Sequence, residues 1–269
     1  MSLPIIKFVS LAALRDKILV TFFAIILIIA SLSGFFGSAL VTEQPDFALV
    51  YKGGGLRMAG IISLVLFVCF YVRRAFDTKE VEYLLTRPLT RLQYILSHSA
   101  AFALIAAVLA ALIALIIFFT ASPDTGGWMM WSYSLVIEFA LMSLIAMFFA
   151  LVVPSAAGAA LICFAFYALA RMIGVLLGIS SMPADNDLMM ALGKLMEVIS
   201  IIVPRFDLMG QSEWLVYGTS QTGGFEIDRW ASSDAAKSIG LSWFIYLQAV
   251  GFSFLVITAS VFDFSRKQF

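Results

Sequence analysis

Charged side chains are scarce in this 269-residue sequence: Asp, Glu, Lys and Arg make up 13% of it, and 17 basic residues balance 17 acidic ones. Soluble globular domains contain about 25% charged residues. Because 62% of the chain is hydrophobic, the composition excludes an ordinary soluble enzyme and a disordered chain. There is no basic excess to neutralise phosphates, so no nucleic-acid partner is expected. The remaining class is a polytopic membrane protein.

Histidine and cysteine are almost absent. His98 is the single histidine, and Cys69 and Cys163 lie in apolar runs, so neither a two-histidine zinc site nor a disulfide framework is indicated. His98 has serine on both sides, but neighbouring helical residues diverge by about 100°, so no catalytic residue is assigned. The chain also lacks the G-x-x-x-x-G-K-[ST] phosphate loop. We therefore expect no metal and no cofactor in this chain.

Long uncharged runs predict a single transmembrane domain over residues 1–269. A helix needs about 20 mostly apolar residues to cross the hydrocarbon, and its backbone groups must bond within the helix, so the predicted fold class is all-α. The sequence predicts six spans, at about 18–38, 55–73, 96–119, 131–153, 157–179 and 239–262.

Three further segments are not predicted to span. Residues 1–17 resemble a helix lying along the membrane interface; a cleaved signal peptide is the alternative, but its apolar region would be about 7–15 residues, shorter than this one. An external segment, 180–238, contains the apolar stretch 188–203, which is too short to cross and includes two charges. We expect it to form an amphipathic or re-entrant helix. The third segment is a cytoplasmic loop, 76–92.

The distribution of charge predicts the orientation. Basic residues are retained in short cytoplasmic loops. With a cytoplasmic N-terminus, the inner segments hold ten basic and five acidic residues, and the outer segments hold six basic and eleven acidic ones. Arg57, Arg205 and Asp207 are counted among the outer charges, and Gly53–Gly55 is interpreted as a flexible external turn. Six spans then place the C-terminus in the cytoplasm as well.

Glu138 and Arg171 are predicted to lie inside the fourth and fifth spans. Each charge costs about 2.5–3.5 kcal/mol near the bilayer centre, and the antiparallel spans place both at a similar depth of about 10–12 Å. An ion pair would relieve both costs. Its role is either a gate or substrate contact on a translocation path or a structural clamp. Gly174 and Gly178 form a G-x-x-x-G pattern that favours close helix packing.

The cytoplasmic loop contains the sequence RRAFDTKEVEYLLTRPLTRLQY, residues 73–94. Asp77 with Glu80 matches a capping box, which predicts a helix beginning there, and Pro88 should end it. Val81, Leu84 and Leu85 supply an apolar stripe. The exposed charges are expected at Lys79, Glu80, Glu82, Arg87 and Arg91. The alternative is a solvated loop that only anchors two spans.

Residues 82–96, EYLLTRPLTRLQYIL, resemble the L-L-S-R-P-I-S-R-x-x-Y/I-L-L-G-K segment of ATP-binding-cassette (ABC) permeases of the type-2 exporter class. Residues 202–207, IVPRFD, are similar to a Leu-Pro-x-x-Asp turn common in the same proteins. The predicted pattern of six spans, with a large external segment before the last one, is also similar to that of these permeases. The chain departs from the motif at Ser97-His98, where the family has Gly-Lys.

The resemblance implies a permease in the bacterial inner membrane, without catalytic activity of its own. It implies that the loop is a coupling helix that contacts a separate ABC ATPase subunit, which would hold ATP and Mg. The implied contact residues are Asp77, Lys79, Glu80, Glu82, Arg87, Pro88 and Arg91. Six spans are half of a family transporter, so a second copy or a related permease is also implied, besides membrane lipid and a possible external partner. Two alternatives stay open: a membrane enzyme acting on lipid or peptide, and a non-transporting membrane anchor.

Overall fold

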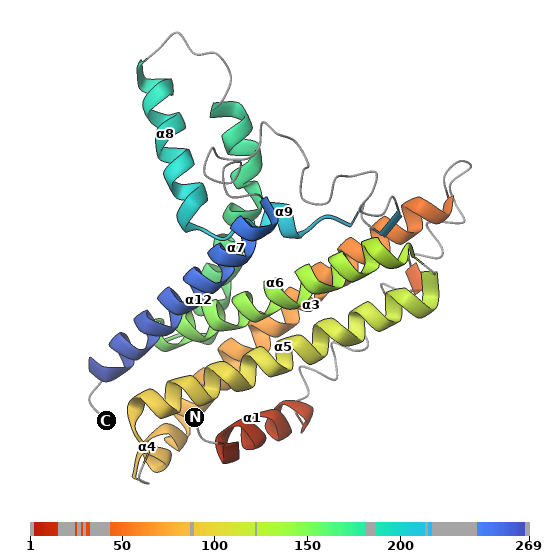
Figure 1. Cartoon of the computed structure of the whole chain (residues 1–269). Coiled ribbons are helices and arrows are strands. Elements are labelled where there is room, and N and C mark those ends of the chain that lie inside the picture. Colours follow the sequence, from red (N-terminus) through yellow and green to blue (C-terminus); the bar gives the residue numbers. More distant parts are fainter. Residues whose placement is uncertain are drawn as a thin grey trace.

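The structure is a computed structural model that describes residues 3–15, 25, 28, 31–32, 44–86, 89–121, 123–180, 187–212, 215–216 and 241–266. All regular elements within these residues are helices (Figure 1). Five helices are long and apolar enough to cross a membrane, which indicates a multi-pass membrane protein: α3 (Gln44–Asp77), α5 (Arg91–Ala121), α6 (Thr125–Val152), α7 (Ala156–Ser180) and α12 (Leu241–Arg266). The predicted span 18–38 lies almost entirely outside the described residues.

Helix α6 lies at the centre of the bundle and contacts α3, α5, α7 and α12 (Figure 1). Its buried residues come from several sides of the helix, as expected for a helix enclosed by neighbours. Phe139 is fully buried, and a Cβ on Gly60 of α3 would overlap its ring. Glycine at position 60 therefore lets α3 and α6 approach closely.

Two helices begin earlier than the sequence predicts. Gly53–Gly55, interpreted as an external turn, lies inside α3, so that prediction is wrong. A Cβ on Gly53 would come within 2.6 Å of Leu215, which shows that the missing side chain leaves room for another segment of the chain. Helix α6 begins at Thr125, where the Asp124 carboxylate accepts a 2.8 Å hydrogen bond from the Gly127 amide as an N-cap.

The amphipathic helix predicted near the N-terminus is present as α1 (Leu3–Arg15), which packs against α5 (Figure 1). Ile5, Val9 and Ala13 recur every four residues and form its buried face. The opposite side exposes Leu11 and Leu14. The position of α1 at a membrane interface stays a prediction.

The stretch predicted at 188–203 is helix α8 (Asp187–Ile202), which lies beside α7 and away from α3 and α5 (Figure 1). Gln248 of α12 binds the C-terminal end of α8. The Gln248 side-chain amide donates to the carbonyl oxygens of Ser200, Ile201 and Val203 at 2.7–2.9 Å. These bonds satisfy carbonyls that the helix end leaves without partners. After this turn the chain enters the bundle as the short helix α9 (Phe206–Met209).

The loop predicted to be cytoplasmic contains helix α4 (Glu80–Leu85). The helix does not begin at Asp77, as the capping-box pattern predicts, because Asp77 is still the last residue of α3. The amide and hydroxyl of Thr78 both donate to the Arg74 carbonyl at 2.9 Å, and Lys79, with a φ of 55°, then turns the chain out of α3.

The packing of α4 is described only in part. Val81 is buried, as its place in the predicted apolar stripe requires. The side chains of Leu84 and Leu85, and all of Arg87 and Pro88, lie outside the described residues.

Candidate functional site

Glu138 is the centre of a cluster of charged side chains inside the bundle, and its side chain is fully buried. Because α6 begins at Thr125, Glu138 lies about 20 Å along the helix at 1.5 Å per residue. The predicted depth of 10–12 Å in the membrane stays a prediction. One carboxylate oxygen is paired with Arg57, and the other accepts a 2.8 Å hydrogen bond from the Tyr167 hydroxyl.

Arg57 of α3 is the principal partner of Glu138 and is 1% exposed. Its Nη1 also donates to the Met209 carbonyl at 2.9 Å, and its Nη2 donates to the Ser134 hydroxyl at 3.1 Å. The guanidinium lies 5.1 Å from the centre of the buried Trp131 ring, within range of a cation–π interaction. Arg57 is therefore buried in the bundle, although the charge count of the sequence places it among the outer segments.

Arg171 of α7 lies at the edge of this cluster. Its Nη1 is 3.9 Å from Glu138 Oε1 and donates to the Phe206 carbonyl at 3.0 Å. A Cβ on Gly210 would overlap the Arg171 guanidinium, so the guanidinium rests directly on the backbone of that glycine. The structure places Glu138 and Arg171 together, as the sequence predicts, but Arg57 makes the closer contact.

A second ion pair joins the cluster through α9. Arg205 donates to both carboxylate oxygens of Asp207, at 2.8 and 2.6 Å, which is the bidentate geometry of a strong pair. Arg205 is fully buried and Asp207 is 15% exposed, so these two residues are not external loop charges either. A Cβ on Gly174 of α7 would overlap the Asp207 carboxylate. Gly174 therefore allows close packing, but against α9; Gly178 is also buried.

Together these contacts fasten α9 to three long helices. Arg57 and Arg171 each bond a backbone carbonyl of the α9 segment, from α3 and α7 respectively. Glu138 of α6 contacts both arginines. The buried Tyr167 ring packs against Phe206 at 5.5 Å between ring centres. The arrangement is a clamp in its geometry, and within the described residues it contains one more guanidinium than carboxylate.

The charged residues of the loop at 76–92 differ in exposure. Asp77, Lys79 and Glu82 are exposed, and Glu80 is half-buried. Arg91 is instead engaged within the chain: its Nη1 donates to the carbonyl oxygens of Phe264 and Ser265, at 3.1 and 2.8 Å. A guanidinium at that position satisfies the last carbonyls of α12 and complements the negative end of the helix dipole.

Aromatic side chains strengthen the same junction. The buried Phe264 stacks on Tyr94 of α5 with ring centres 5.1 Å apart and planes 4° apart. Phe76, near the end of α3, meets Phe264 edge to face at 6.5 Å. The ends of α3, α5 and α12 are therefore packed together, and α4 packs against α3.

His98 does not form a nucleophile pair with its neighbour Ser99. Its Nδ1 lies 3.0 Å from the Tyr94 carbonyl, whereas the Ser99 hydroxyl donates to the Met147 sulfur at 3.7 Å. The described residues contain no group of three or more His, Cys, Asp and Glu side chains suited to a metal ion. Cys69 and Cys163 are free and buried.

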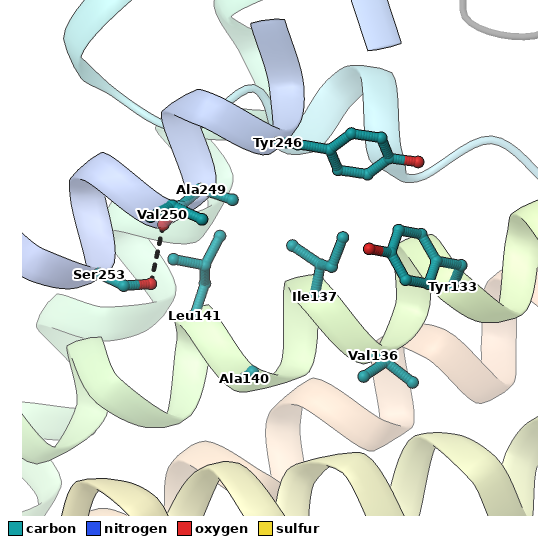
Figure 2. A pocket seen from close by; sticks show the side chains of 9 residues that line it. All are labelled: Tyr133, Val136, Ile137, Ala140, Leu141, Tyr246, Ala249, Val250 and Ser253. Carbon is teal, nitrogen blue, oxygen red and sulfur yellow. Dashed lines mark hydrogen bonds between the residues drawn. The ribbon is translucent and has the colours of Figure 1, made fainter. Parts of the chain in front are cut away.

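A separate apolar groove of about 350 Å³ lies between α6 and α12 (Figure 2). Tyr133 and Tyr246 stand at one end of it, edge to face at 5.3 Å, and aliphatic side chains line the rest. The Ser253 hydroxyl bonds the Ala249 carbonyl of its own helix. The groove therefore offers an apolar surface and no charge.

Comparison with known proteins gives no relative. No protein-family model and no curated protein matches the chain. The resemblance of residues 82–96 to ABC permeases is therefore the resemblance of one segment. The function has to be inferred from this segment, from its place in the fold and from the contacts described above.

Proposed function

We propose that this chain is the membrane-spanning permease subunit of an ATP-driven ABC exporter. A separate ATPase subunit would hold ATP and Mg, and its hydrolysis of ATP would drive movement of a substrate across the membrane. The observation that supports this most is helix α4, a short charged helix between two candidate spans in the segment that resembles the family's coupling motif. We place both termini in the cytoplasm of a bacterial inner membrane and expect a dimer with a second copy or a related permease.

The contacts of the loop support a coupling role. Its exposed Asp77, Lys79 and Glu82 present charges of both signs to a partner. Arg91, which lies in the loop and begins α5, bonds the end of α12. A displacement of α4 would therefore reach α3 and α5 through the chain and α12 through Arg91. A loop that merely anchored two spans would need no bond to the last one.

Charge reversal on the loop tests the proposal. The double variant Lys79→Glu with Glu82→Lys changes two exposed side chains and leaves Arg91 in place. We expect the tagged wild-type chain to purify with a protein that contains a phosphate loop and hydrolyses ATP, and the double variant to lose that protein. Asp46→Lys, an exposed change in the first turn of α3, is the matched control and should retain it.

Three results would count against the proposal. If the wild type, the double variant and the Asp46→Lys control all retain the ATPase equally, the loop is not the surface that binds it. Turnover of a lipid or peptide by the purified chain alone would favour the membrane enzyme. A stable complex without ATP-dependent transport in proteoliposomes would favour the anchor.

A further inference from the structure

We propose that Arg171 binds a phosphate-type anion at the edge of the Glu138 cluster. The anion would come from an anionic lipid headgroup or from a soluble phosphate. This inference does not depend on the proposed function, because the binding is a property of the bundle and needs no ATPase.

The charge balance of the cluster is the first argument. Among the described residues, the cluster contains the guanidiniums of Arg57, Arg171 and Arg205 and the carboxylates of Glu138 and Asp207. The two carboxylates are each in close contact with one arginine, Glu138 with Arg57 and Asp207 with Arg205. Charges inside a membrane protein are costly unless they are paired. The surplus positive charge therefore resides at Arg171, whose nearest carboxylate is 3.9 Å away and already paired.

The accessibility of the three arginines is the second argument. The side chains of Arg57 and Arg205 are 1% and 0% exposed, whereas that of Arg171 is 31% exposed. The surplus charge is thus on the one arginine of the three that an external anion can reach. Basic pockets between membrane helices bind anionic headgroups in this way.

The third argument is that the Arg171 guanidinium is held in place. Its contacts with Phe206 and Glu138 both use Nη1, and the Gly210 backbone lies against it. Among the described residues, no hydrogen bond engages Nε or Nη2, the two donors on one edge of the guanidinium fork, which can meet a planar pair of phosphate oxygens. A fixed guanidinium also loses less side-chain entropy when an anion binds.

The surface beside Arg171 fits a lipid source. Val175, one turn from Arg171, and Met172 are exposed on the same helix, at 54% and 50% of their surface. Acyl chains can lie against these residues while the headgroup meets the guanidinium. A soluble phosphate would use the guanidinium alone, so a comparison of the two probes identifies the source.

The test is a binding measurement on the full chain in zwitterionic micelles. Phosphatidylglycerol, phosphatidylcholine and inorganic phosphate are titrated separately, and the shift of the thermal unfolding midpoint reports binding. We expect phosphatidylglycerol, inorganic phosphate or both to raise the midpoint, and phosphatidylcholine to have no effect. Arg171→Gln should weaken the anion's affinity roughly tenfold or more, and Arg171→Lys should weaken it less. Arg266→Gln, an exposed arginine at the end of α12, is the control and should bind as the wild type.

A second variant covers the case in which Arg171→Gln does not fold. Gly210→Ala keeps the charge but displaces the guanidinium, so it should also weaken binding, with the unfolding midpoint without anion reporting on the fold. The proposal is overturned if neither anion binds the wild type, or if Arg171→Gln or Gly210→Ala binds with unchanged affinity.

Discussion

Among the described residues, arginine side chains bond backbone carbonyls in two regions. One is the Glu138 cluster, and the other is the junction where Arg91 of α5 meets the end of α12. In the cluster, Arg57 is 1% exposed and has Glu138 as its counter-charge. At the junction, the partly buried Arg91 bonds carbonyls at the end of α12. A buried guanidinium depends on its counter-charge, whereas a guanidinium near solvent can exchange its partner for water. The same contact should therefore contribute very different free energies in the two regions.

The largest effect is expected when the carboxylate of the cluster is removed. Glu138→Gln leaves Arg57 buried beside a neutral amide, and breaking a buried pair in this way costs about 3–5 kcal/mol. The midpoint of thermal unfolding in detergent should fall accordingly. Glu82→Gln, an exposed change on α4, should change stability by no more than about 0.5 kcal/mol. An equal effect of the two variants would mean that the pair in the bundle is solvated.

Removing both charges of the pair should be less harmful than removing one. Arg57→Met with Glu138→Met replaces the pair by apolar side chains and leaves no uncompensated charge between them. Such exchanges are often neutral or stabilising. We expect the double variant to be more stable than either single variant in the same unfolding assay. Additive losses of stability would contradict the pairing of Arg57 with Glu138.

A smaller effect is expected where α7 meets α9. Gly174→Ala would push against the Asp207 carboxylate, and overpacking of this kind costs about 1–3 kcal/mol. Gly251→Ala is the matched control, because a Cβ at Gly251 of α12 meets nothing within 4 Å. That control should stabilise the helix by up to about 1 kcal/mol. In unfolding measurements we expect Gly174→Ala to lower the free energy of unfolding and Gly251→Ala to raise it. A change in the same direction for both variants would argue against close contact at Gly174.

The smallest effect is expected at the junction. Arg91→Gln removes the hydrogen bonds to the end of α12, and water can replace them in part, so the loss should be about 0.5–1.5 kcal/mol. Lys79→Gln, an exposed change on the same loop, is the control and should be close to neutral. Hydrogen exchange at residues 260–266 is the more sensitive measurement, because it reports local opening of the helix end. Unchanged exchange would show that Arg91 does not hold α12.

The sequence predicts most of the helices because long uncharged runs have one stable form in a membrane. It misplaces the N-terminal ends of α3 and α6, and at α3 the reason is physical. Gly53–Gly55 has the composition of a turn, but Gly53 and Gly54 provide room for Ser212 and Leu215 to pack against a continuous helix. Because α3 is continuous through these glycines, Arg57 lies within the helix and its side chain is buried in the bundle.

The candidate site shows the same limit. Glu138 and Arg171 are recognisable because they interrupt apolar runs, and the structure places them 3.9 Å apart. Arg57 also has apolar neighbours, which is the signal that could have identified it. Arg205 and Asp207 carry no such signal, since they follow a proline in a segment of mixed composition. Their burial depends on the entry of α9 into the bundle, which is a tertiary event.

Site-specific photocrosslinking from α4 tests the proposed coupling role most directly. A photoreactive phenylalanine analogue in place of Tyr83, which is 62% exposed on α4, should crosslink in native membranes to a protein that contains a phosphate loop. The same analogue in place of Tyr133, which is 54% exposed beside the α6–α12 groove, should not. If the Tyr83 position crosslinks to no ATPase, or the Tyr133 position crosslinks to one equally well, α4 is not the coupling helix of an ABC exporter.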